Sequence, residues 1–105
     1  MEHTSFEDLQ THIQALYRHG EYTAALELAT EQAPNFPEQH HLLAYWQICM
    51  AARTDQAGLA LNVLDELLES GFWYGETLLR KSPSLAALQG LPEFEVRVAR
   101  SLALQ

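Results

Sequence analysis

Five histidines are the residues of this chain that first suggest a metal site. His40 and His41 are adjacent, so on a helix they point about 100° apart and cannot bind one ion together. His12 and His19 are separated by about two helical turns, which is too far for a simple chelating pair. The chain has no helical H-x-x-x-H and no C-x-x-C spacing. We therefore expect surface or boundary histidines, with no metal and no cofactor.

Cys49 is the next candidate, because a thiol beside a histidine can act as a nucleophile. It lies inside an apolar stretch, however, where a buried cysteine behaves as a small hydrophobic side chain. The carboxylate pairs Glu27/Glu31 and Asp65/Glu69 stand four residues apart, which is typical of solvated helix faces. We expect no catalytic residue. A helical enzyme or ligand-binding domain that uses the histidines and Cys49 is kept as an alternative.

The charge balance excludes several classes of partner. The chain carries 14 acidic residues against 6 basic ones, a formal net charge of −8. Nucleic-acid binding needs a basic stripe, and an anionic membrane surface attracts basic segments, so neither partner is expected. The acidic excess has two interpretations that stay open. It keeps a small protein soluble, or it provides an acidic face that recruits a basic partner.

The cysteine content and the first residues bear on location. A single cysteine excludes a disulfide within the chain. The N-terminal stretch has neither the basic region nor the apolar region of a signal peptide. No apolar run approaches the ~18 residues that span a bilayer. A cytoplasmic location is the default expectation.

Apolar residues recur at helical spacing along most of the chain, and strand formers are sparse, so we expect an all-α fold. Thr4 or Ser5 can cap the first helix, with Asp8 at the third position after Ser5. A break at 33–37 follows from its two prolines. The expected helices cover approximately residues 6–19, 22–32, 37–53, 57–69, 73–80, 83–90 and 91–102.

A stretch of the chain repeats itself at a fixed offset. Residues 18–26 can be laid over residues 53–61, an offset of 35 positions. The same offset carries Ile13 onto Ile48. Internal periods of about 20–50 residues indicate stacked supersecondary units, which usually form binding surfaces rather than active sites.

The residues of these units resemble the tetratricopeptide repeat family. Gly20-Glu21-Tyr22 followed by Ala25 is similar to that family's turn and to the small residue of its second helix. Ala60 is the counterpart in the second unit, and Pro37 matches the proline that closes a repeat. The resemblance implies antiparallel helix pairs in a right-handed stack, whose concave face grips a peptide or a partner helix.

The resemblance divides one domain, 1–105, into two degenerate repeats, 5–36 and 37–71, and a C-terminal helical cap at 72–105. A cap is expected because each repeat leaves one face unsatisfied, and about three units make a stable stack. The alternative is that the aromatic cluster at 72–74 is exposed for binding. The residues expected to bury themselves in the cap are Phe72, Trp73, Leu78, Leu79, Leu85, Leu88 and Phe94.

The resemblance also implies a partner-binding groove on the first helix of each unit. Tyrosine and arginine are the residues that commonly anchor interfaces. Arg18 and Arg53 are equivalent across the offset, and their guanidinium groups can fork onto carboxylates of a partner. The alternative is that both arginines pair with this chain's own acids. The residues implied for the groove are Gln10, Gln14, Tyr17, Arg18, Leu42, Tyr45 and Arg53.

From these observations we expect a small cytoplasmic interaction module that binds another protein or a peptide in a concave groove. A structural homodimer, in which a second copy of the chain fills the groove, stays open as an alternative. The sequence contains nothing that identifies the partner.

Overall fold

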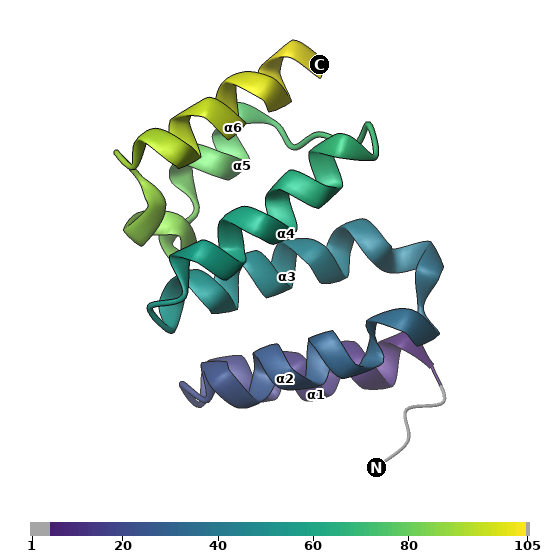
Figure 1. Ribbon diagram of the computed structural model, residues 1–105. Coiled ribbons are helices and arrows are strands. Elements are labelled where there is room, and N and C mark those ends of the chain that lie inside the picture. The colour runs from purple at the N-terminus through teal and green to yellow at the C-terminus, as the bar shows by residue number, and fades with distance from the viewer. Residues whose placement is uncertain (1–4, 105) are drawn as a thin grey trace.

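The computed structural model describes residues 5–104, and within that range every regular element is helical, which confirms the all-α expectation (Figure 1). Thr4, one of the two expected caps, lies outside the described residues. No helix in the described range is long and apolar enough to cross a bilayer. The elements in chain order are α1 Phe6–Arg18, α2 Tyr22–Gln32, the 3-10 helices η1 Ala33–Asn35 and η2 Pro37–Gln39, α3 His40–Arg53, α4 Ala57–Glu69, α5 Glu76–Lys81, the 3-10 helix η3 Pro83–Leu88, and α6 Pro92–Leu104.

The first helix begins and ends where its sequence signals it. The Ser5 hydroxyl accepts a hydrogen bond from the Asp8 backbone N–H at 3.2 Å, which satisfies one of the donors left free at a helix start. Leu9 and Ile13, one turn apart on the same side, are buried. The helix thus presents one apolar face to the rest of the protein.

The repeat in the sequence corresponds to two helical hairpins with the same turn. Gly20 has φ +76° and Asp55, its counterpart, has φ +60°. The Glu21 N–H bonds to the carbonyl of residue 16, and the Gln56 N–H bonds to the carbonyl of residue 51, both at 2.9 Å. The small residues that follow, Ala25 and Ala60, are fully buried. The 35-residue offset therefore describes backbone geometry as well as residue types.

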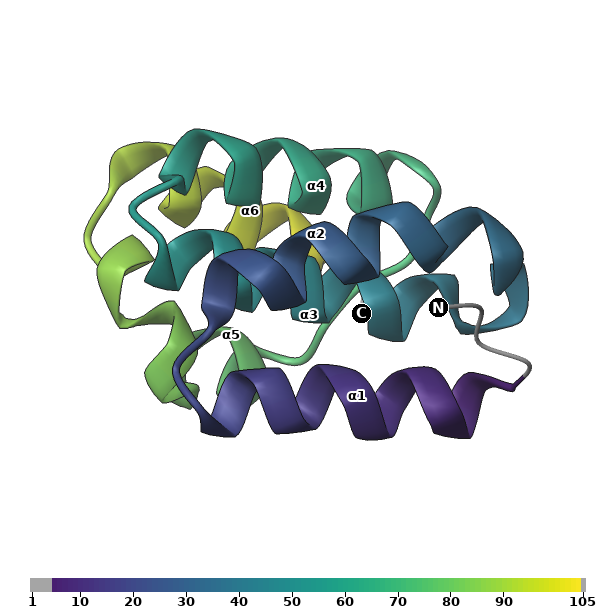
Figure 2. The same ribbon diagram turned by 90° about the horizontal axis from the view of Figure 1, so that it is seen from below.

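The helices form three tiers of two, with α1 beside α2, α3 beside α4, and α5 beside α6 (Figure 1). Seen from below, α2, α4 and α6 lie on one side of the molecule, and α1 and α5 lie on the other (Figure 2). The middle tier contacts both of its neighbours, because α2 packs on α3 and α6 packs on α4. Helix α3 holds the largest share of the core, including Leu43, Ile48 and Met50.

Two helix boundaries differ from the sequence expectation. The third helix begins at His40 rather than at residue 37 or 38, because Pro34 and Pro37 each lie within the first two residues of a 3-10 turn and neither provides a backbone donor. The helix expected from residue 73 begins at Glu76. The Tyr74 backbone is unavailable to a helix there, since the Ser101 hydroxyl accepts from its N–H at 2.9 Å and donates to its carbonyl at 2.7 Å.

The C-terminal segment covers the middle tier, but with a different set of residues than expected. Phe72, Trp73 and Leu78 are 38%, 40% and 41% exposed, so their expected burial is wrong. The extended backbone after Gly71 turns the Tyr74 ring inward instead, where its hydroxyl donates to the His41 carbonyl at 2.6 Å. The expectation is correct for the residues that are fully buried, Leu79, Leu85, Leu88 and Phe94.

Candidate functional site

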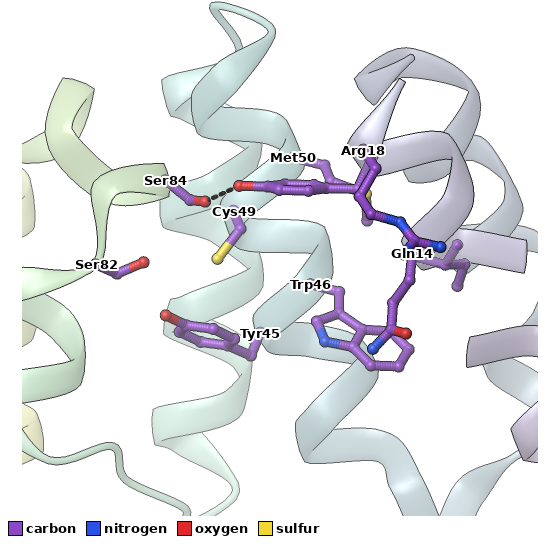
Figure 3. A pocket seen from close by; sticks show the side chains of 10 residues that line it. Gln14, Arg18, Tyr45, Trp46, Cys49, Met50, Ser82 and Ser84 are labelled. Carbon is purple, nitrogen blue, oxygen red and sulfur yellow. Dashed lines mark hydrogen bonds between the residues drawn. The ribbon is translucent and has the colours of Figure 1, made fainter. Parts of the chain in front are cut away.

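A cavity of about 360 Å³ lies between α1, α3 and the segment that joins α5 to η3. We call it the α1–α3 cavity. Gln14 and Arg18 on α1 stand on one side of it, and Ser82 and Ser84 stand on the other (Figure 3). Its walls are mostly apolar and are closed at one end by hydroxyl groups and a thiol. The lining residues are Ile13, Gln14, Tyr17, Arg18, Tyr45, Trp46, Cys49, Met50, Ser82 and Ser84.

The structure brings four of the seven expected groove residues to this cavity, namely Gln14, Tyr17, Arg18 and Tyr45. Gln10 and Leu42 are half-buried on the same two helices but do not line it. Arg53 does not line it either, although it bonds to a residue that does. Their role in binding a partner stays a prediction.

Ser84 ties the C-terminal segment to both hairpins. The Ser84 hydroxyl is hydrogen-bonded to the Tyr17 phenol of α1, and it accepts from Arg53 Nε of α3 at 3.0 Å. The Arg53 guanidinium carbon lies 5.3 Å from the ring centroids of both Tyr17 and Tyr22. Such cation–π contacts orient a cation as well as stabilise it. We call Tyr17, Tyr22, Arg53 and Ser84 the Ser84 cluster.

Aromatic rings stiffen the wall of the cavity. Trp46 stacks on Phe6 with ring centroids 5.7 Å apart and planes 6° from parallel. The Tyr45 ring meets the Tyr74 ring edge-to-face at 5.3 Å. Paired rings of this kind contribute about 0.5–1.5 kcal/mol beyond the area that they bury. The cavity is therefore held open by packed side chains rather than by mobile ones.

Burial favours the neutral forms of two groups in the cavity wall, Cys49 and Tyr45. Burial raises the pKa of the Cys49 thiol, an effect that hydrogen bonding with Tyr45 and Ser84 and the charge of Arg53 only partly offset. Burial likewise raises the pKa of the Tyr45 phenol to about 12. A nucleophilic cysteine needs the opposite shift, since the thiolate is the reactive form. Cys49 instead contributes a small, neutral, weakly polar surface.

The arginines at the cavity have no carboxylate partner among residues 5–104. Arg18 and Arg53 make no ion pair in that range, so the alternative in which they pair with this chain's own acids is not observed there. Among the described residues that line the cavity, Arg18 is also the one that carries a charge. The site is thus a positive spot on an acidic chain.

A second hollow, of about 410 Å³, has the opposite character. It lies between α2 and α4, and Glu27 and Glu31 are its charged lining residues. Leu59, 40% exposed, and the buried Leu26 contribute apolar surface to it. No three histidine, cysteine or carboxylate side chains converge to hold a metal ion within residues 5–104.

Several residues of the cavity were not predicted from the sequence. They differ in whether the sequence contains a signal for them. Trp46 and Met50 lie on α3 within one turn of Tyr45 or Cys49, so helical spacing alone was a usable signal. Ser82 and Ser84 reach the cavity from a part of the chain more than 60 residues after Tyr17, a separation that the Tyr17–Ser84 bond spans. A tertiary contact of that kind leaves no local pattern.

Comparison with known proteins identifies a different family from the one that the sequence resembled. A family model described as "A/B hydrolase-like, N-terminal domain" matches residues 5–102. The resemblance to the tetratricopeptide family is therefore wrong: paired helices with a small residue at the crossing satisfy general packing needs and are not specific to that family. Searches of the curated proteins and of the solved structures gave no match. The match covers most of the chain, and the chain belongs to the A/B hydrolase-like N-terminal domain family.

Proposed function

We propose that this chain is a non-catalytic binding domain that receives a segment of a partner polypeptide in the α1–α3 cavity. The observation that carries the proposal is the cavity itself, about 360 Å³ with aromatic walls and one polar end. Ligand sites in proteins typically occupy about 300–1,000 Å³ and combine apolar walls with a few polar groups. At the lower end of that range, a cavity suits one or two large side chains of a partner.

The geometry supports binding rather than chemistry in this part of the chain. An α/β-hydrolase places its nucleophile at a sharp turn above a β-sheet. Residues 5–104 form helices only, and the neighbours that influence Cys49 are Tyr45, Ser82, Ser84 and Arg53, with no histidine among them. In this proposal, any hydrolytic chemistry associated with the family resides outside these residues.

The family description makes a hydrolase-like domain the first partner to test. We propose that the interaction takes place in the cytoplasm, in keeping with a single, buried cysteine. A second copy of the chain is the alternative occupant, and it requires a dimer in solution.

The test uses a variant that blocks the cavity from its rim. Peptides are selected from a random 12-residue display library on the immobilised protein, and their affinities are measured by calorimetry. Gln14 is exposed and lines the cavity, so Gln14→Trp should fill its mouth without disturbing the core. Thr11, exposed on the same helix but outside the cavity, provides the matched control Thr11→Trp.

We expect peptide binding to fall at least tenfold in Gln14→Trp and to stay within twofold of the parent in Thr11→Trp. Equal binding by the two variants would place the interaction elsewhere and overturn it. A dimer by sedimentation that dissociates in Gln14→Trp but not in Thr11→Trp would replace the proposed partner with a second copy of the chain.

A further inference from the structure

The arginines of this protein divide into two groups by their partners. Arg80 pairs with Glu95 at 2.5 Å, and Arg97 and Arg100 both pair with Asp65. Arg18 and Arg53 pair with no carboxylate within residues 5–104, although the chain carries 14 acids against 6 bases. An acid-rich chain readily supplies partners to its cations, so two that lack them at one site call for an explanation.

One of these arginines lines the α1–α3 cavity, and the other contacts a residue of its wall. Arg18 lines it beside Gln14 (Figure 3), and Arg53 is bonded to the Ser84 hydroxyl in its wall. No carboxylate of residues 5–104 lines the cavity. An anion that enters it therefore meets the Arg18 guanidinium and no carboxylate from the described part of the chain.

The Arg53 side chain is held in place by its neighbours. Its Nε donates to Ser84 and its guanidinium lies over two tyrosine rings, whereas its terminal nitrogens make no hydrogen bond within residues 5–104. Those nitrogens are the donors of the planar fork that binds a carboxylate. Because the side chain is held by neighbours, less conformational freedom is lost when the fork is used.

We infer that the occupant of the α1–α3 cavity is an acidic polypeptide segment, in which a large apolar side chain is flanked by a carboxylate. The apolar side chain fills the space between Trp46 and Met50, and the carboxylate binds Arg18 at the rim. Arg53, which contacts the cavity wall at Ser84 without lining the cavity, adds positive charge to the site. This inference rests on the proposed function, since it names the chemistry of the partner that the cavity receives.

The charge of the whole protein decides how the inference is tested. A net charge of −8 repels an acidic peptide at long range, while the two arginines attract it at contact. Salt screens both effects, so salt dependence does not separate them. Neutral substitutions do, because Glu→Gln in the peptide removes charge at constant size and Arg→Gln in the protein removes the positive charge.

The experiment takes the peptides selected on the immobilised protein and compares each with its Asp→Asn or Glu→Gln counterpart. We expect selected peptides to combine an acid with a neighbouring aromatic or leucine residue, and the neutral counterpart to bind at least tenfold more weakly. The double variant Arg18→Gln/Arg53→Gln should lose that preference. Arg100→Gln removes one positive charge, as Arg18→Gln alone does, but at an ion pair on another helix, and it should change affinity less than twofold.

Arg18 is exposed and makes no side-chain hydrogen bond or ion pair within residues 5–104, so Arg18→Gln alone is a second test if the double variant is unstable. It should weaken the binding of acidic peptides at least threefold. If the selected peptides are apolar, contain no acidic residue and lose binding to Gln14→Trp, the inference is wrong and the proposed function still holds. If the selected peptides are basic and bind Gln14→Trp as well as they bind the parent, the inference and the proposed function are both wrong. Binding would then be expected at the hollow lined by Glu27 and Glu31. A selection that enriches no peptide would also overturn both.

Discussion

Tyr45 and Cys49 show how burial controls the chemistry of the cavity wall. Neither side chain has a cation in place to hold its ionised form strongly, and removal from water disfavours that form. Burial is the largest cause of the raised pKa in both groups, and it also raises the pKa of Tyr74 behind Tyr45. The polar end of the cavity is thus made of neutral hydrogen-bonding groups over the whole physiological range.

The raised pKa of Tyr45 predicts a loss of stability in alkali. A free tyrosine ionises near pH 10, whereas Tyr45 in the folded protein ionises near 12. Its contribution to stability is therefore complete below about pH 10 and is lost as pH rises toward about 12. Urea melts between pH 8 and pH 12 should show falling stability, and Tyr45→Phe should make the fall shallower. An equally steep fall in that variant would contradict the assignment.

Ser84 marks the limit of what the sequence predicts about the site. Tyr17, Arg18 and Tyr45 were predicted from the internal offset and the family resemblance, and they do lie at one cavity. The Ser84 hydroxyl joins Tyr17 to Arg53 across the fold, and no spacing rule relates a serine to residues so distant in the chain. Its contact depends on how the C-terminal segment folds back, which is a property of the packed structure.

The two hairpin turns explain why the repeat was detectable and also why it was incomplete. Both turns need one residue in the left-handed region, where glycine is unstrained and aspartate is among the better-tolerated alternatives. Gly20 and Asp55 fill that position in the two hairpins. The absence of glycine in the second turn therefore conceals a shared geometry. The break before α3 was predicted from its prolines, but the exact start was not, because 3-10 and α turns compete there.

Ala25 and Ala60, the small residues at equivalent positions of the two hairpins, predict where the hairpins are least tolerant of a larger side chain. Ala25 and Ala60 are completely buried, whereas Ala24, next to the first, is exposed. Ala25→Trp or Ala60→Trp should lower the free energy of unfolding by ~1–3 kcal/mol or more, because a close-packed crossing has no room for an indole. Ala24→Trp is the matched control and should change it by less than ~0.5 kcal/mol. Thermal melts in which all three variants match the parent would contradict this packing.

The C-terminal third of the chain contributes large buried side chains to the core, as the two hairpins do. Leu85 and Leu88 of η3 pack on α3, and Phe94 and Val98 of α6 are fully buried beside α4. Burial of each such side chain contributes roughly 1.5–3 kcal/mol. The burial of each aromatic residue before α5 does not follow from the sequence. An apolar cluster in a non-helical segment turns some rings inward and others outward, as Tyr74 and Trp73 do.

Removal of residues 72–105 should therefore leave a chain that no longer folds cooperatively. The truncation uncovers the faces of α3 and α4 and removes Ser84 from the cavity wall. We expect dye binding typical of exposed apolar surface, a broad thermal transition and self-association, measured by fluorescence, calorimetry and sedimentation. A truncated chain that stays monomeric with a sharp transition would show that the C-terminal segment is dispensable for folding.

The contrasting surroundings of the two tryptophans have a practical consequence. Trp46 is half-buried in the cavity wall, stacked on Phe6, while Trp73 is 40% exposed on a separate segment. Replacing Trp73 with phenylalanine leaves one indole, and its emission colour and accessibility to quenchers then depend on the cavity alone. The protein thus contains an intrinsic optical reporter, with which occupancy can be followed in real time without an attached dye.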